Sequence, residues 1–311
     1  MSCDNYSLSS IDQIDNPSPV LPPLTKWIGG KRKISWLIRE IYVLNGSMRL
    51  VEPFAGGLGV AFGVNPESVL GNDINPYLIA LYKGIKSGNQ FTLPMEMSSE
   101  MYYQYRADFN FLCGEKVVSW QVAQYFFYLV NSGFNGLWRM SKANRFNVPV
   151  GRYSKVNYSR PLNEYAEKFK KWEFTSGDFE AVKTYSEDLI FIDSPYYKTF
   201  TSYSVEGFSW EDQVRLAVWA SERECPVIVT NSNDKKLMSL YGELGFHVRE
   251  IYARRSVGAK GKTRKLYKEM IAFKNCLLPK SILGCSRKVS SLGVSFSTCH
   301  NYKNPTSGKE G

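Results

Sequence analysis

Apolar residues fall into two kinds of segment that alternate along the chain. Short apolar runs have the length of buried strands and lie near residues 49–54, 68–71, 172–175, 189–193, 226–230, 246–251 and 268–274. Longer segments carry apolar residues at helical spacing and cover residues 33–43, 76–85, 210–222 and 234–243. Ser209 and Asp212 are spaced as a capping box for the helix that starts at Trp210. Strands alternating with helices predict an α/β fold.

The alternation is interrupted between residues 86 and 170, which predict a mostly helical insertion. Within it, residues 117–130 predict a helix whose aromatic stripe belongs in the core: Trp120, Tyr125, Phe127 and Tyr128. Residues 23–85 and 171–276 then form the main domain. Residues 1–22, rich in Ser, Asn, Asp and Pro, are expected to be a flexible arm, and residues 277–311 a disordered tail.

The most informative short motif is Asp193-Ser194-Pro195-Tyr196, which follows the apolar run Leu189–Ile192. The carboxylate can accept hydrogen bonds, the proline stiffens the turn, and the tyrosine ring can stack on a flat ring. Such a set suits an exocyclic amine on a planar base. On its own such a motif is more often an ordinary strand-end turn.

A second pattern, a glycine loop and a strand-end acid, makes a functional role for the Asp193 motif more plausible. The predicted strand Leu50–Phe54 runs into Ala55-Gly56-Gly57-Leu58-Gly59, and the next strand ends in Asn72-Asp73. Glycines after a strand let backbone approach a ligand closely, and an acid at the end of the second strand can hold a ribose diol. The order is that of a nucleotide-binding half-sheet. The chain has no G-x-G-x-x-G and no G-x-x-x-x-G-K-[ST] pattern, so neither a dinucleotide nor a nucleoside triphosphate is favoured.

Charge favours an anionic partner. The formal net charge is +10 and the pI is about 9.2. Residues 131–160 contain six basic and no acidic residues, and residues 252–268 contain seven and none. Both stretches also carry glycines and aromatics, as do loops that track phosphates and stack on bases. Two solvated basic loops are the alternative interpretation, which is less favoured.

The remaining composition excludes several classes of site. Six cysteines form no C-x-x-C pair, so neither zinc nor a disulfide framework is indicated. Two histidines, His247 and His300, argue against histidine-based catalysis and against a histidine metal site. No signal peptide and no apolar run of membrane-spanning length is recognisable, so a cytoplasmic location is expected.

Read in order, the motifs resemble those of the Dam-type N6-adenine DNA methyltransferases, the D12 class with the alpha motif order. The resemblance extends from about Leu24 to Phe273. The matching stretches are Lys26-Trp27-Ile28-Gly29-Gly30-Lys31, Glu52-Pro53-Phe54-Ala55-Gly56-Gly57, Asn72-Asp73-Ile74-Asn75, Phe134-Asn135-Gly136-Leu137-Trp138-Arg139, Phe146-Asn147-Val148-Pro149-Val150-Gly151-Arg152-Tyr153, Thr230-Asn231-Ser232 and Arg254-Arg255-Ser256-Val257.

Two positions depart from the usual family pattern. Ser194 stands where the family has the first proline of D-P-P-Y, and Leu58 stands where many members carry glycine. The F-x-G-G-L version of the first loop is similar to phage-encoded members. The resemblance implies a Rossmann-like S-adenosylmethionine-dependent methyltransferase sheet with a target-recognition insertion, in a bacterial or phage-infected cell.

The resemblance also implies which residues hold S-adenosylmethionine. Asp73 would hold the ribose hydroxyls, and Lys31 would pair with the methionine carboxylate. The other cofactor-binding residues that it implies are Trp27, Phe54, Gly56, Asp178, Phe179 and Asp193. No metal is expected.

For catalysis, the resemblance implies that a flipped adenine enters the site formed by Asp193, Ser194, Pro195 and Tyr196. Asp193 and the Ser194 carbonyl would accept the two N–H bonds of the amine and free its lone pair for direct in-line attack on the sulfonium methyl. Since Ser194 keeps the carbonyl, activity is expected.

For DNA reading, the family motif places a guanine-reading arginine at Arg139. The other implied contacts to duplex DNA are Lys26, Asn135, Leu137, Pro149 and Tyr153. By analogy the expected target is GATC.

Other functions stay open. The chain could be a DNA-binding protein that has lost methyl transfer, with Ser194 as the trace of that loss. It could also be an N4-cytosine methyltransferase or an RNA adenine methyltransferase, although the two F-N motifs favour adenine in duplex DNA. The sequence does not give the oligomeric state or the biological role.

Overall fold

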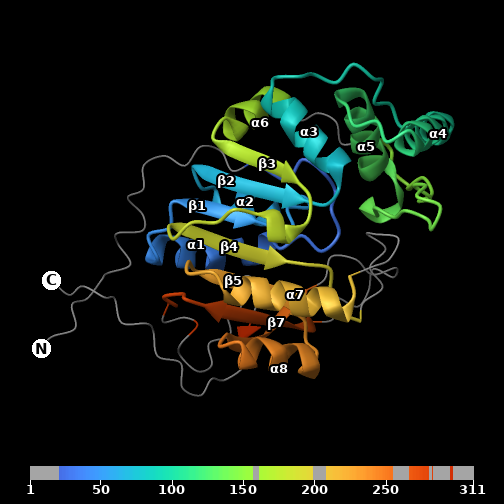
Figure 1. Cartoon of the computed structure of the whole chain (residues 1–311). Coiled ribbons are helices and arrows are strands. Elements are labelled where there is room, and N and C mark those ends of the chain that lie inside the picture. Colours follow the sequence, from blue (N-terminus) through green and yellow to red (C-terminus); the bar gives the residue numbers. More distant parts are fainter. Residues whose placement is uncertain are drawn as a thin grey trace, which may run out of the picture.

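The computed structural model describes residues 21–156, 161–198, 208–254, 266–279, 282 and 295–296. Its centre is an eight-stranded sheet in the order β3-β2-β1-β4-β5-β7-β6-β8 (Figure 1). The strands are β1 (Arg49–Glu52), β2 (Ser68–Asp73), β3 (Trp172–Ser176), β4 (Asp188–Asp193), β5 (Val227–Ser232), β6 (His247–Arg254), β7 (Leu266–Lys274) and β8 (Ser295–Phe296). Strands β1 to β5 are parallel, whereas β7 is antiparallel to both of its neighbours. The sheet is therefore Rossmann-like, as expected.

Helices are α1 (Ser35–Leu44), α2 (Gly59–Val64), α3 (Pro76–Lys86), α4 (Ser99–Gly114), α5 (Trp120–Ser132), α6 (Leu162–Phe169), α7 (Trp210–Ser221) and α8 (Lys235–Glu243), with short 3₁₀ turns η2 (Arg32–Ile34), η3 (Phe134–Gly136) and η4 (Phe179–Ala181). Every strand and helix that the sequence predicts is present. The capping box of α7 is confirmed, because Ser209 accepts from the Asp212 amide and Asp212 accepts from the Ser209 amide.

Three helices were not predicted. Two glycines break the apolar pattern of α2, which has only six residues. In α4 the buried positions follow helical spacing, but Tyr103 and Phe111 are exposed between them and blur the stripe. The third, α6, is eight residues long and follows Pro161 directly. The shortness of α2 and α6, and the blurred stripe of α4, make these helices depend on tertiary packing more than on local propensity.

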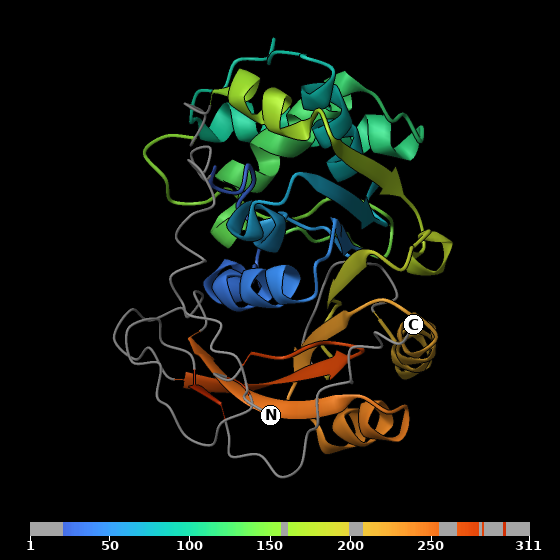
Figure 2. The ribbon, with the colours of Figure 1, turned by 90° about the vertical axis from the view of Figure 1, so that its left-hand side faces the viewer.

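The sheet has a separate apolar core on each face. Along β4, Leu189 and Phe191 join the core beneath α1, α2 and α3, while Ile190 and Ile192 join the core beneath α7 and α8. Successive strand side chains point to opposite faces, so this continuous apolar run is buried on both. Figure 2 shows α1 and α7 on opposite sides of the sheet.

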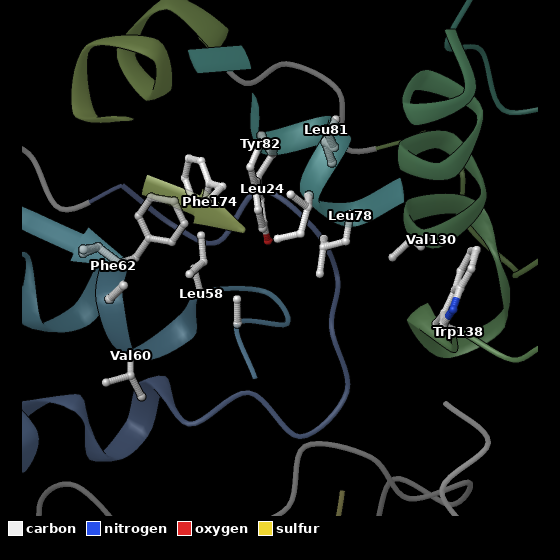
Figure 3. Close-up of a cluster of buried hydrophobic side chains, with 14 of the residues drawn as sticks. Leu24, Leu58, Val60, Phe62, Leu78, Leu81, Tyr82, Val130, Trp138 and Phe174 are labelled. Atoms are coloured by element: carbon white, nitrogen blue, oxygen red, sulfur yellow. The ribbon is translucent and has the colours of Figure 1, made fainter. Parts of the chain in front are cut away.

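Aromatic side chains join the insertion to the sheet. Figure 3 shows Phe62, Tyr82 and Phe174 around the glycine loop, with Val130 and Trp138 of the insertion in the same cluster. Phe169 of α6 packs on Phe62, Tyr82 and Phe174, so α6 lies against the sheet. The predicted core stripe of α5 is confirmed, since Tyr125, Phe127 and Tyr128 are buried and Trp120 packs against the core.

The part of the insertion from α4 to the chain that follows α5 lies beyond the carboxyl ends of the parallel strands (Figure 1), whereas α6 lies against the sheet. Figure 1 shows α4, α5 and the chain that follows them at the end to which β2 and β3 point. Two isolated antiparallel bridges, Gly133 to Val150 and Met140 to Phe146, shape the chain after α5. In the described part, no helix is long and apolar enough to cross a membrane.

Some expectations lie outside the described residues. These are the N-terminal arm up to residue 20, the basic stretch 255–265, with Arg255, Ser256 and Val257 of the last family motif, and nearly all of the tail from residue 280. The domain boundaries inferred from the sequence stay predictions.

One buried acid terminates β1. The Glu52 side chain accepts from the Ala61 amide of α2 at 2.7 Å, and the residue is 4% exposed. The pKa of Glu52 is raised to about 8, mainly by burial and in small part by the Asp193 charge, while the hydrogen bond from the Ala61 amide lowers it. The group therefore takes up a proton on folding at neutral pH.

Gly84→Ala is predicted to destabilise the protein by about 1–3 kcal/mol through overpacking. A Cβ at Gly84 would lie 2.2 Å from the Trp120 ring, which is stacked on Phe91 and would have to shift. The matched control is Gly242→Ala in α8, where nothing lies within 4 Å and helix propensity favours alanine by up to about 1 kcal/mol. Urea unfolding measures both, and equal effects would contradict the packing argument.

Glu52→Gln is predicted to remove a pH dependence of stability. Between the ordinary pKa of 4.5 and the folded pKa of about 8, folded wild type holds a proton that the unfolded chain has released. This group's contribution therefore falls as pH rises through that window, by up to about 1.4 kcal/mol per pH unit. Unfolding free energies of both proteins at pH 5, 6, 7 and 8 measure the difference. A difference that stays constant with pH would refute the assignment.

Candidate active site

The candidate site lies where the strand order reverses, between β1 and β4. In open α/β sheets, ligands bind outside the carboxyl ends of the strands at such a switch point. The glycine loop after β1, Asp73 at the end of β2 and Asp193 at the end of β4 all meet this edge. The segment from Lys26 to Lys31 crosses the same edge before η2 begins.

Asp193 is fixed by groups from two other segments. Its carboxylate accepts from the Thr230 hydroxyl of β5 at 2.9 Å and lies 3.3 Å from the Lys31 ammonium. Burial raises the pKa of Asp193 and the Glu269 charge adds to the rise, while Lys31 and Thr230 lower it. The positive charge of Lys31 thus favours the ionised form of the Asp193 carboxyl group.

Glu269 is a site residue that the sequence analysis missed. It lies on β7 opposite Ser232, accepts from the Tyr196 hydroxyl at 2.9 Å, and is 3.8 Å from the Lys31 ammonium. The Lys31 ammonium also lies 4.7 Å from the centre of the Tyr196 ring. A buried acid at the start of the apolar run 270–273 is the signal that could have found it.

The turn itself is held from β5 and α7, again by residues to which the sequence analysis gave no role. Asn231 donates to the Ser194 hydroxyl at 3.2 Å, and Gln213 donates to the Pro195 carbonyl at 2.9 Å. Ser194, Asn231 and Gln213 are at most 2% exposed. All four residues of the predicted catalytic motif therefore have side-chain or backbone contacts to neighbouring elements.

The glycine loop is braced by Asp73. Its two carboxylate oxygens accept from the amides of Gly56 and Asn75, each at 2.9 Å, and burial raises the pKa of Asp73 against these two bonds. Gly56 has a φ of +44°, and a Cβ there would lie 2.7 Å from the Trp27 indole nitrogen. Only glycine combines this conformation with this close approach.

The aromatic rings of Phe54 and Phe179 and the acid Asp178 belong to the same candidate site. Phe54 and Phe179 have ring centroids 5.6 Å apart, so two of the predicted cofactor residues are in contact. Asp178 accepts from the Arg215 guanidinium at 2.9 Å, and this guanidinium also lies over the Phe179 ring. The Asp178 side chain is 45% exposed.

The chemistry of these groups fits an amphipathic nucleoside with a charged tail. Carboxylates at Asp73 and Asp178 can accept from hydroxyl or amine groups, the Phe54 and Phe179 rings offer apolar walls, and Lys31 offers a cation. In the part of the chain that the structure covers, no group of three or more His, Cys, Asp or Glu residues is arranged to hold a metal ion.

Among the predicted DNA-contacting residues, Lys26 and Tyr153 contact each other, whereas Arg139 has a different partner. Lys26 donates to the Asn131 carbonyl at 3.1 Å and lies 3.5 Å from the centre of the Tyr153 ring, and burial lowers the pKa of Lys26. Arg139 is held instead by Asn147, whose side-chain oxygen accepts from Nε at 2.6 Å.

The other three predicted contacts are Asn135 and Pro149, both exposed, and Leu137, half-buried. Asn135 has a φ of +55°. A Cβ at Gly136 would lie 2.8 Å from Lys26, so Lys26 packs directly against the chain that carries Asn135 and Leu137.

Comparison with known proteins gives the family. The profile of the D12 class of N6 adenine-specific DNA methyltransferases matches residues 27–257. The retron Ec67 DNA adenine methylase of Escherichia coli is 33% identical over 262 residues, covering 80% of this chain and 90% of that protein. The DNA adenine methylase of E. coli K12 is 31% identical over 267 residues, covering 80% and 93%.

A phage protein is similar as well. The DNA N-6-adenine-methyltransferase of Escherichia phage P1 is 33% identical over 269 residues, which is 80% of this chain and 35% of that protein. Since the family profile spans most of the chain, and relatives above 30% identity match along nearly their whole length, this chain belongs to the D12 class of N6 adenine-specific DNA methyltransferases.

Proposed function

We propose that this adenine-specific DNA methyltransferase acts on duplex DNA at GATC, with S-adenosylmethionine as donor, base flipping and direct in-line transfer. The observation that carries the proposal is the Asp193 carboxylate, held at the end of β4 by Thr230 and Lys31 with the Tyr196 ring anchored beside it. The family implies S-adenosylmethionine as the methyl donor. The target sequence comes from motif resemblance.

The cofactor residues act by binding and by orienting. Asp73 would accept from the ribose hydroxyls of the cofactor with the oxygen lone pairs that the Gly56 and Asn75 amides leave available. Phe54 would pack beside the methionine part, and Asp178 and Phe179 would face the adenine of the cofactor. Lys31 pairs with the cofactor's carboxylate, and Trp27 covers the glycine loop. Bound there, S-adenosylmethionine supplies a sulfonium methyl group as the electrophile.

The target amine is a weak nucleophile because its lone pair is delocalised into the adenine ring. Asp193 accepts one N–H and the Ser194 carbonyl accepts the other, which localises the lone pair on nitrogen. The Tyr196 ring lies flat against the base, and Glu269 holds the tyrosine hydroxyl so that the ring does not turn away. Positioning and hydrogen bonding then supply the rate, and no covalent intermediate is required.

The deciding experiment is methylation of a random-sequence duplex with labelled cofactor, followed by mapping of the modified positions. Methyl groups on N6 of adenine within GATC support the proposal. Modification of cytosine, or of an RNA substrate offered in parallel, would favour the alternative enzymes. Cofactor binding without transfer would indicate a catalytically impaired DNA-binding protein.

Asp193→Ala is predicted to lower the rate of methyl transfer by about a hundredfold or more, because it removes the acceptor for the amine proton. The dissociation constant for duplex DNA should stay unchanged, which serves as the internal control. Single-turnover rates and DNA binding are measured on the same preparations. Residual transfer above a tenth of wild type would overturn the assignment of Asp193.

Arg139→Ala is predicted to relax the preference for one guanine beside the target adenine. A bidentate contact to guanine contributes about 1–3 kcal/mol of discrimination, whereas a phosphate contact weakens all sequences equally and lowers the salt slope by about one unit. Competition between duplexes that differ at one base pair, at two salt concentrations, measures the effect.

The matched control is Arg145→Ala, an exposed arginine of the same basic stretch, for which at most uniform weakening is expected. If Arg139→Ala behaves like this control, Arg139 contacts phosphate, and specificity resides elsewhere in the insertion.

A further inference from the structure

The turn after β4 lacks the ring that normally stiffens it. The family pattern has proline at the second position, and here Ser194 leaves that φ unrestrained by a pyrrolidine ring. In the proposed function the carbonyl of this residue accepts one N–H of the amine, so its orientation bears on the rate. In this chain, side-chain hydrogen bonds from neighbouring elements contact the turn at Ser194 and Pro195.

Three consecutive residues of β5 hold the turn along its length. Thr230 donates to the Asp193 carboxylate at 2.9 Å, and Asn231 donates to the Ser194 hydroxyl at 3.2 Å. The Asn231 side-chain oxygen accepts from the Tyr197 amide at 3.1 Å, and the Ser232 hydroxyl donates to the Tyr197 carbonyl at 2.9 Å.

Gln213 of α7 completes this set from the other side. Its amide nitrogen donates to the Pro195 carbonyl at 2.9 Å, and its oxygen accepts from the Asn231 nitrogen at 3.2 Å. Asn231 and Gln213 are both 0% exposed. Since the Asn231 oxygen accepts two backbone amides, from Tyr197 and Ser232, its nitrogen must face Ser194 and Gln213, and the orientation of each amide is determined by its partners.

We propose that Asn231 and Gln213 are positioning residues for methyl transfer, and that the bond from Asn231 to the Ser194 hydroxyl replaces the stiffening of the missing proline. This inference rests on the proposed function. The two amides contact the turn at Ser194, Pro195 and Tyr197, which bracket the Ser194 carbonyl and the Tyr196 ring. Buried hydrogen bonds of this kind are costly to leave half-made, so loss of one partner loosens the turn.

The test compares two buried glutamines. Gln213→Met removes the amide that holds Pro195 while keeping side-chain length. The matched control is Gln124→Met in α5, where a 2% exposed glutamine accepts from the Thr92 and Leu93 amides, far from the turn in the sequence. Both variants should lose thermal stability. Only Gln213→Met should lower the single-turnover rate, by roughly 5- to 50-fold, with the KM for DNA and for S-adenosylmethionine changed less than about twofold.

A double-mutant cycle tests the role of the serine. Ser194→Ala should also lower the rate, and its effect should combine with Gln213→Met to less than the product of the two, because both act through Asn231. In a Ser194→Pro background the penalty of Gln213→Met should shrink at least threefold, since the ring then stiffens the turn. If the proline variant does not fold, the alanine cycle decides the question.

The outcomes separate this inference from the proposed function. Wild type that transfers no methyl group to DNA adenine contradicts the proposed function. Active wild type in which Gln213→Met and Gln124→Met have equal rates, or in which Gln213→Met raises only KM, overturns the positioning role. Rate penalties of Ser194→Ala and Gln213→Met that multiply independently overturn the role of the serine hydroxyl.

Discussion

The burial of carboxyl groups at one edge of the sheet is the constraint on which the site depends. Glu52, Asp73, Asp193 and Glu269 all lie at this edge, and each would be costly to keep charged there without partners. Asp73 accepts from the amides of Gly56 and Asn75, and Glu52 accepts from the Ala61 amide of α2. Lys31 contacts the other two acids, Asp193 and Glu269, so its ammonium offsets the negative charge of both carboxylates.

The segment that carries Lys31 also joins the two halves of the protein. At its start, Lys26 contacts Asn131 and Tyr153 of the insertion. Trp27 then packs on the glycine loop, and Lys31 reaches Asp193. A single short stretch therefore touches the proposed DNA-reading residues, the proposed cofactor loop and the proposed catalytic carboxylate.

Side chains of β5 hydrogen-bond to the proposed catalytic turn along its length. A proline ring restricts one backbone angle, whereas the side chains of β5 and Gln213 hold the turn at several atoms on both sides. Such bonds form at full strength only because the residues are buried and competing water is absent. The Ser194 departure is therefore compatible with an ordered site.

The sequence by itself determined the parts of this protein that depend on local pattern. The strand and helix periods, the α7 capping box and the motif stretches before and after the insertion are all legible from neighbouring residues. The strand-end acids Asp73 and Asp193 could be assigned to one edge because parallel strands share their carboxyl ends.

Only the tertiary structure brought Glu269 to Lys31 and Tyr196, and Gln213 to Asn231. Those contacts arise because β7 inserts antiparallel beside β5 and α7 packs over that face, a strand order that no local period encodes. The helices α2 and α4 likewise exist because burial against the sheet or against neighbouring helices outweighs their interrupted or weak local pattern.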